Sequence, residues 1–202
     1  GGLYEWAGLS GLAGQTGKRL YVLVNALVIA GLAWSDTPDN TGLKFAVLIG
    51  ALFCVVCLVW LRHFNFAREP NGRNRSIKLL AGSLSCIPAW AALLLLHGGD
   101  EGPVWTLFAI GMIAASDSGA YLFGVNFGKH KLAPNISPGK SWEGFWGGLF
   151  TTTLFALLCM PLFAGGIADA WRFALLGLAT ALFAVSGDLF ESLLKRHAQV
   201  KD

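Results

Sequence analysis

The feature that most constrains this chain's fold is a series of six long apolar runs, separated by short connections that carry most of the charge. A helix of about twenty apolar residues is long enough to cross the hydrocarbon core of a bilayer. We therefore predict an all-α fold, a polytopic transmembrane helical bundle with about six spans. We expect residues 1–202 to form a single integral-membrane domain. The predicted spans cover roughly residues 20–34, 43–61, 77–96, 103–127, 144–164 and 171–194.

The composition agrees with a membrane protein. Hydrophobic residues make up 54% of the chain and charged residues 13%, whereas a soluble domain carries about a quarter charged residues. We therefore expect membrane lipids as partners, and no nucleic acid.

The cysteines and histidines do not indicate a metal centre. Cys54 and Cys57 form a C-x-x-C motif, but it lies inside an apolar run without polar neighbours. We interpret both as small packing residues rather than redox or metal-binding groups. The histidines lie at the ends of runs without ligand spacing, and we interpret them as surface residues: His63, His97, His130 and His197.

The connections between the runs alternate in charge. Basic residues gather at 18–19, 62–78, 129–140 and 195–201, whereas the intervening connections are acidic or neutral. By the positive-inside rule the basic connections face the cytoplasm, and six spans alternate without conflict. The basic segment 62–76 has two interpretations: a patch that binds lipid headgroups, or a simple determinant of topology, which we favour.

Two pairs of glycines have the small-x-x-x-small spacing that lets helices approach closely: Gly124 with Gly128, and Gly144 with Gly148. Helix packing explains these glycines at least as well as contact with a ligand does.

The segment from Asp117 to Gly148 contains the first candidate site. Asp117 follows the uncharged stretch Pro103–Ser116, which places a carboxylate well inside a predicted span. Such an acid costs several kcal/mol unless it is paired, hydrated or bound to a cation, so it indicates function. The loop that follows supplies cations and hydroxyl groups: Lys129, Lys131, Ser137, Lys140 and Ser141. An acid for a metal beside lysines for phosphate oxygens indicates phosphoryl chemistry at a membrane face.

A second candidate site lies near the end of the sixth run. On a helix, Asp188, Glu191 or Ser192, and Lys195 would lie on one face. Two carboxylates below the cytoplasmic surface, with lysines above them, favour a magnesium ion that shares its coordination with substrate phosphates. The alternative interpretation is an Asp–Lys pair that only ties helices together.

Two long blocks of this sequence resemble bacterial phosphatidate cytidylyltransferase, also called CDP-diacylglycerol synthase. They are DSGAYLFGVNFGKHKLAPNISPGKSWEGFWGG from Asp117 and SGDLFESLLKRHAQVKD from Ser186. The second block matches the start of that family's signature, S-x-x-K-R, four residues, then K-D. The similarity spans the chain and is strongest over residues 104–202.

The resemblance implies an enzyme, a nucleotidyltransferase that transfers CMP from CTP to phosphatidic acid and releases pyrophosphate in phospholipid biosynthesis. It also implies Mg²⁺ and a multi-pass location in the bacterial inner membrane, with the active site facing the cytoplasm. A homodimer is one option for the oligomeric state. The phosphate of phosphatidic acid is itself a nucleophile, so no serine or cysteine nucleophile is needed. Divalent cations and lysines would relieve the repulsion between the two anions.

We assign residue roles on this basis. The expected catalytic residues are Asp117, Asp188 and Lys195. The expected substrate-binding residues are Lys129, Ser137, Lys140, Ser141, Ser192, Arg196 and Lys201. The expected metal ligands are Asp188, Asp117 and Asp202.

Other classes of protein remain as alternatives. A CTP-dependent lipid or polyprenol kinase would transfer the γ-phosphate to an alcohol, and an ion-coupled transporter would use the intramembrane acids for coupling. A magnesium-dependent prenyltransferase is disfavoured, because its paired Asp-rich motifs are not present in this sequence. In the family that this chain resembles, the signature continues into an H-G-G stretch and a D-R-x-D group, and this sequence ends before them. We therefore expect both ends of a natural protein to be missing, and this chain to fold but not to turn over.

Overall fold

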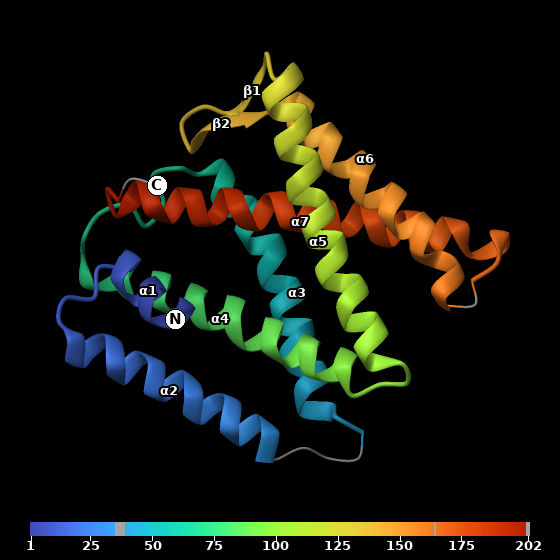
Figure 1. Ribbon diagram of the computed structural model, residues 1–202. Coiled ribbons are helices and arrows are strands. Elements are labelled where there is room, and N and C mark those ends of the chain that lie inside the picture. Colours follow the sequence, from blue (N-terminus) through green and yellow to red (C-terminus); the bar gives the residue numbers. More distant parts are fainter. Residues whose placement is uncertain (35–38, 164, 201–202) are drawn as a thin grey trace. The chain divides into compact units, whose positions relative to one another are not determined.

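A computed structural model describes residues 1–34, 39–163 and 165–200. Seven α-helices and a two-stranded hairpin form these parts of the chain (Figure 1). The helices are α1 (Gly2–Leu9), α2 (Gln15–Trp34), α3 (Thr41–Arg62), α4 (Gly72–His97), α5 (Gly102–Phe127), α6 (Trp142–Cys159) and α7 (Ala170–His197). The strands are β1 (Lys131–Ala133) and β2 (Ser137–Ser141), and two short 3₁₀ turns are η1 (Met160–Phe163) and η2 (Ile167–Asp169).

Six of the helices are long and apolar enough to cross a membrane, which confirms the predicted all-α, polytopic fold. They are α2 to α5, α6 together with η1, and α7 together with η2. Each begins between one and five residues earlier than the corresponding predicted run. Two elements were not predicted: the short helix α1 and the hairpin, which we had expected to be a loop.

The chain divides into two compact units, which are described separately. Unit 1 comprises residues 1–100 and the end of the chain from Leu193, and unit 2 comprises residues 101–192. Helix α7 therefore contributes its first part to unit 2 and its last residues to unit 1.

In unit 1, side-chain donors from α1 and α2 bind backbone carbonyls of α4. The indole Nε1 of Trp6 donates to the carbonyl of Lys78 at 2.8 Å, and the Tyr21 hydroxyl donates to that of Leu79 at 2.8 Å. Gly82 permits this approach, since a side chain there would collide with the Trp6 indole and the Tyr21 hydroxyl. A small apolar core of Leu43, Ala46 and Ala91 joins α3 to α4.

In unit 2, α5 and α6 pack side by side along their lengths (Figure 1). A Cβ atom at Gly144 would lie 2.7 Å from the Ala120 carbonyl oxygen, so the glycine sets how closely the helices approach. The Thr151 hydroxyl also donates across the interface to the Ala115 carbonyl at 2.9 Å. These contacts support the packing interpretation of the Gly144-x-x-x-Gly148 motif.

An aromatic and apolar cluster fills unit 2 farther along the same helices. Phe108 and Met112 of α5 pack against Ala156 of α6 and Phe173 of α7. All four side chains are buried, so this cluster fixes the first part of α7 against the α5–α6 pair.

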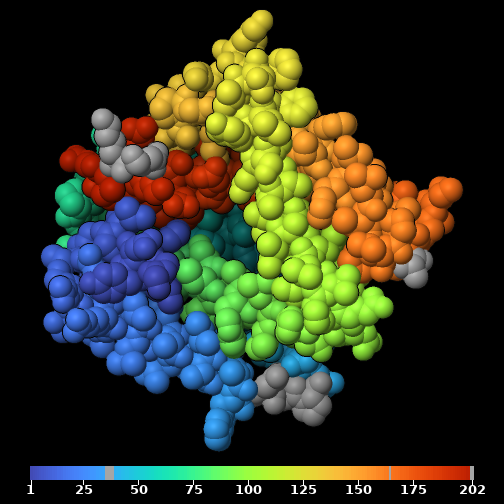
Figure 2. Space-filling model, in the orientation of Figure 1, coloured from blue at the N-terminus to red at the C-terminus, as the bar shows by residue number. Residues whose placement is uncertain are grey.

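The hairpin extends from the ends of α5 and α6. Figure 2 shows its gold atoms beside the yellow end of α5. Its strands pair antiparallel, with Lys131 opposite Ser141. His130, before β1, joins the hairpin to α6: its Nδ1 lies 2.7 Å from Glu143 Oε1, and its carbonyl accepts from the Trp142 N–H at 2.9 Å. His130 is 79% exposed, as predicted for a surface residue.

Candidate active site

Unit 2 contains a cavity of about 610 Å³ that gathers residues from α5, both strands of the hairpin, α6 and α7. Helix α5 contributes Asp117, strand β2 contributes Lys140 and Ser141, the start of α6 contributes Gly144, and α7 contributes Asp188. Four of these five were predicted as site residues from the sequence, although they are up to 71 positions apart.

Lys140 and Asp188 form an ion pair within this cavity. The pair joins β2 to α7, and both groups remain accessible, with 22% of the Lys140 side chain and 56% of the Asp188 side chain exposed. A pair as open as this contributes at most about 1 kcal/mol to stability. Its more important consequence is chemical, because it places a carboxylate and an ammonium side by side in one cavity.

Asp117 lies in the middle of α5 and lines the same cavity. Its side chain is exposed, and no ion pair joins it to another of the described residues. A carboxylate in a candidate span without a cationic partner of its own is suited to bind a cation or a proton.

Ser141 has a structural role that the sequence did not indicate. It is the N-cap of α6, and its buried Oγ accepts the Gly144 N–H at 3.1 Å. The hydroxyl can still donate its own proton, since accepting a hydrogen bond uses only a lone pair. A ligand in the cavity would therefore meet a fixed donor beside the Lys140 ammonium.

The other predicted residues do not line this cavity. Lys129, Ser137, Ser192 and Lys195 lie outside it, and Arg196 lines a different cavity, in unit 1. Lys201 and Asp202 lie outside the described residues.

The cavity is also lined by two residues with polar side chains, Tyr121 and Glu191, to which no role in the site was assigned from the sequence. Glu191 follows Asp188 by three residues on α7, and Tyr121 follows Asp117 by four on α5. Helical spacing from the two predicted acids was the signal for both, because positions i+3 and i+4 share a face.

The described residues contain no group of three or more His, Cys, Asp and Glu side chains close enough to hold a metal ion by themselves. The acids that line the cavity are nonetheless oxygen donors, which Mg²⁺ prefers. Mg²⁺ commonly binds to one or two protein carboxylates and completes its coordination with substrate phosphates and water. The carboxylates that line the cavity, Asp117, Asp188 and Glu191, are donors of the type that such a shared ion would use.

The fold and the cavity define a class: a multi-pass membrane protein whose site combines carboxylates with a lysine and suits phosphate groups. The model of the cytidylyltransferase family matches residues 1–202. The chain belongs to this family.

Its curated relatives include several phosphatidate cytidylyltransferases. The one from Pseudomonas aeruginosa is 35% identical over 202 residues, which is 100% of this chain and 72% of the relative. The one from Haemophilus influenzae is 39% identical over 139 residues, covering 64% of this chain and 48% of the relative. The one from Mycobacterium leprae is 42% identical over 163 residues, covering 73% of this chain and 51% of the relative.

Proposed function

We propose that the full-length protein that contains this chain catalyses the transfer of CMP from CTP to phosphatidic acid, giving CDP-diacylglycerol and pyrophosphate. Membership in the cytidylyltransferase family and the names of the relatives support the reaction. The observation that supports its location is the cavity of unit 2, where Lys140 pairs with Asp188 and Asp117 lies in the same lining.

The reaction joins two anions. A phosphate oxygen of phosphatidic acid attacks the α-phosphorus of CTP, a new P–O bond forms, and the bond to the β-phosphate oxygen breaks to release pyrophosphate. Charge repulsion is the main obstacle, so cationic groups fixed near the reacting phosphates supply most of the acceleration. Lys140 serves this purpose, and the Ser141 hydroxyl donates to a phosphate oxygen beside it.

Magnesium is the proposed cofactor. Asp188 would be its first ligand and Asp117 its second ligand or an orienting group, with Glu191 one turn further along α7. When bound, Mg²⁺ neutralises phosphate charge and supports the leaving pyrophosphate. Because Lys140 and Asp188 are paired, a cation on the carboxylate and a phosphate on the ammonium would be neighbours.

The charge pattern supports a cytoplasmic location for the site. Lys140 belongs to one of the basic connections, which the positive-inside rule assigns to the cytoplasm, where CTP is found. We therefore propose a bacterial inner-membrane enzyme whose site opens to the cytoplasm, with a homodimer as an option to be tested.

Labelled CTP distinguishes this reaction from the kinase alternative. The full-length protein in detergent–lipid micelles with phosphatidic acid and magnesium should convert CTP labelled at the α-phosphorus into labelled CDP-diacylglycerol. CTP labelled at the γ-phosphorus should give only labelled pyrophosphate. Label from the γ-position in the lipid would instead identify a lipid kinase. If neither label were converted, both cytidylyl transfer and lipid phosphorylation would be contradicted.

A further inference from the structure

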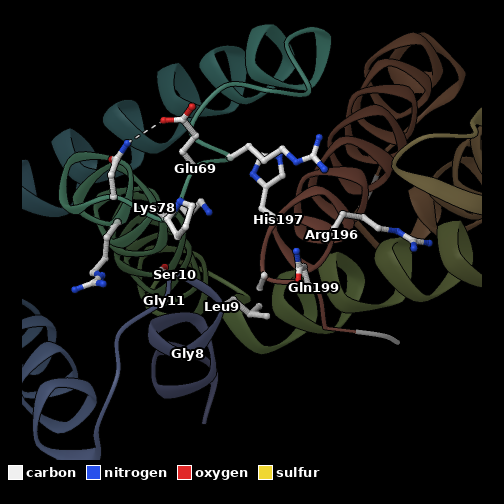
Figure 3. Close-up of a pocket in the computed structure, with 14 residues that line it drawn as sticks. Gly8, Leu9, Ser10, Gly11, Glu69, Lys78, Arg196, His197 and Gln199 are labelled. Atoms are coloured by element: carbon white, nitrogen blue, oxygen red, sulfur yellow. Dashed lines mark hydrogen bonds between the residues drawn. The ribbon is translucent and has the colours of Figure 1, made fainter.

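Unit 1 contains a second polar cavity, of about 520 Å³, which the proposed reaction does not use. It lies between the end of α1, the segment before α4, the first turns of α4 and the end of α7 (Figure 3). It opens where two candidate spans end, because α4 begins at Gly72 and α7 ends at His197.

Lys78 is the unusual residue of this cavity. Only 6% of its surface is exposed, yet its ammonium makes no ion pair or hydrogen bond with any residue that the structure describes. A buried charge without a partner is strongly unfavourable, so such groups normally bind a counterion. Figure 3 shows the Lys78 amine directed into the space between α1 and the end of α7.

The surrounding charges make the cavity attractive to anions. Arg68, Arg75 and Arg196 line it together with Lys78, and Glu69 is the one acid among the described lining residues. The Glu69 carboxylate accepts a long hydrogen bond from the Asn71 amide, at 3.5 Å, rather than pairing with Lys78. The lining therefore has an excess of positive charge.

Hydrogen bonds hold the walls of the cavity in place. Asn71 caps α4 by accepting the Asn74 N–H at 2.8 Å, and the Asn74 amide donates to the Glu69 carbonyl at 3.0 Å. His197 Nε2 lies 2.7 Å from the Phe64 carbonyl, which attaches the end of α7 to the segment before α4. The prediction that His197 is a surface residue was wrong in this respect, since its ring is half-buried and packs edge-on against Phe64.

We propose that this cavity binds the phosphate group of an anionic phospholipid, with Lys78 as its principal cation. A phosphate supplies the missing counterion and can accept hydrogen bonds from several arginines at once. A lipid is favoured as its source, because cavities at the ends of membrane helices lie at the level of the headgroups. Arg68 and Arg75 of this lining belong to the basic segment 62–76, so the proposal gives that segment the headgroup role that the sequence alone had placed second.

Thermal unfolding in neutral detergent tests the proposal. Dioctanoyl phosphatidylglycerol at ten times its dissociation constant should raise the Tm by about 3–6 °C. Dioctanoyl phosphatidylcholine, whose headgroup has no net charge, should raise it by less than a third as much. In Lys78→Gln the effect of phosphatidylglycerol should disappear, and without lipid this variant should be at least as stable as the wild type, because an unpaired buried charge has been removed.

Two further variants keep the test decisive. Arg75→Gln changes an exposed residue and should fold normally with a reduced response to phosphatidylglycerol. Lys44→Gln removes an exposed lysine of unit 1 outside the cavity and should respond like the wild type. If phosphatidylglycerol raised the Tm of Lys78→Gln, Arg75→Gln and the wild type equally, the proposal that the lipid binds in this cavity would be contradicted. Stabilisation by inorganic phosphate or CTP but not by phosphatidylglycerol would contradict the proposal that the bound phosphate group belongs to a lipid.

Discussion

At the scale of single residues, the Lys140–Asp188 pair is the centre of the proposed site. The sequence predicted both residues, and also Asp117 and Ser141, because the motifs around them are specific. It did not predict that Lys140 and Asp188 pair, since nothing in local spacing links positions 48 residues apart. Nor did it predict the cap formed by Ser141, because the start of α6 was placed at Gly144 rather than Trp142.

Exchanging the two charges separates a structural pair from a catalytic one. Lys140→Asp combined with Asp188→Lys should restore the ion pair. The unfolding free energy of this double variant should therefore lie within about 1 kcal/mol of the wild-type value. Turnover should stay reduced by about a hundredfold or more, because phosphate and magnesium would each meet the wrong charge. Thermal unfolding and CDP-diacylglycerol formation are measured on the same preparation.

Lys131→Asp with Asp169→Lys is the matched control for that exchange. Lys131 is exposed and Asp169 is partly exposed. Neither residue lines the cavity, and their substitution should leave turnover within a few-fold of the wild type. Full activity in the Lys140–Asp188 exchange would show that the pair only ties β2 to α7.

At the scale of elements, the close contact of α5 and α6 positions both sides of the cavity. Glycine spacing predicted this packing correctly, because small residues are needed wherever membrane helices approach closely. The hairpin escaped prediction, since its strands are three and five residues long and contain Pro138 and Gly139, which are typical of loops. The pairing of the two strands and the His130–Glu143 contact beside them are tertiary contacts, which the strand propensities of single residues do not predict.

Widening this interface should disturb the site. Gly144→Val would place a Cβ 2.7 Å from the Ala120 carbonyl oxygen and 3.2 Å from both Gly124 Cα and Ser141 Oγ. We expect a loss of about 1–3 kcal/mol in stability together with a large loss of turnover, measured by thermal unfolding and product formation. Gly139→Ala is the control, because nothing lies within 4 Å of its new Cβ, and it should change neither quantity appreciably. A fully stable, fully active Gly144→Val would contradict the packing account.

At the scale of the whole molecule, the six candidate spans among the described residues and the alternation of loop charge predict a topology. Length and hydropathy predicted the spans well, because a bilayer requires long apolar helices. The extent of each helix was less predictable, since polar residues at the helix ends have no periodic signal and are fixed by caps such as Asn71.

Accessibility labelling tests that topology. Cysteines placed at Asn71 and Asn135 should react with an impermeant reagent only from the cytoplasmic side, and one placed at Asn40 only from outside. The physical reason is the positive-inside rule applied to the basic connections that contain the first two positions. Equal accessibility of Asn40 and Asn135 from one side would contradict a six-span arrangement.

The central claim is that cytidylyl transfer takes place in the cavity lined by Asp117, Lys140 and Asp188, and a comparison of two acid-to-amide variants tests it most directly. Asp188→Asn should lower CDP-diacylglycerol formation by about a hundredfold or more while the protein stays folded, because a magnesium ligand is lost. Asp169→Asn, which removes an exposed acid paired with Arg172 in the same unit, should retain nearly full turnover. Near-normal turnover of Asp188→Asn at low magnesium concentration would contradict the account.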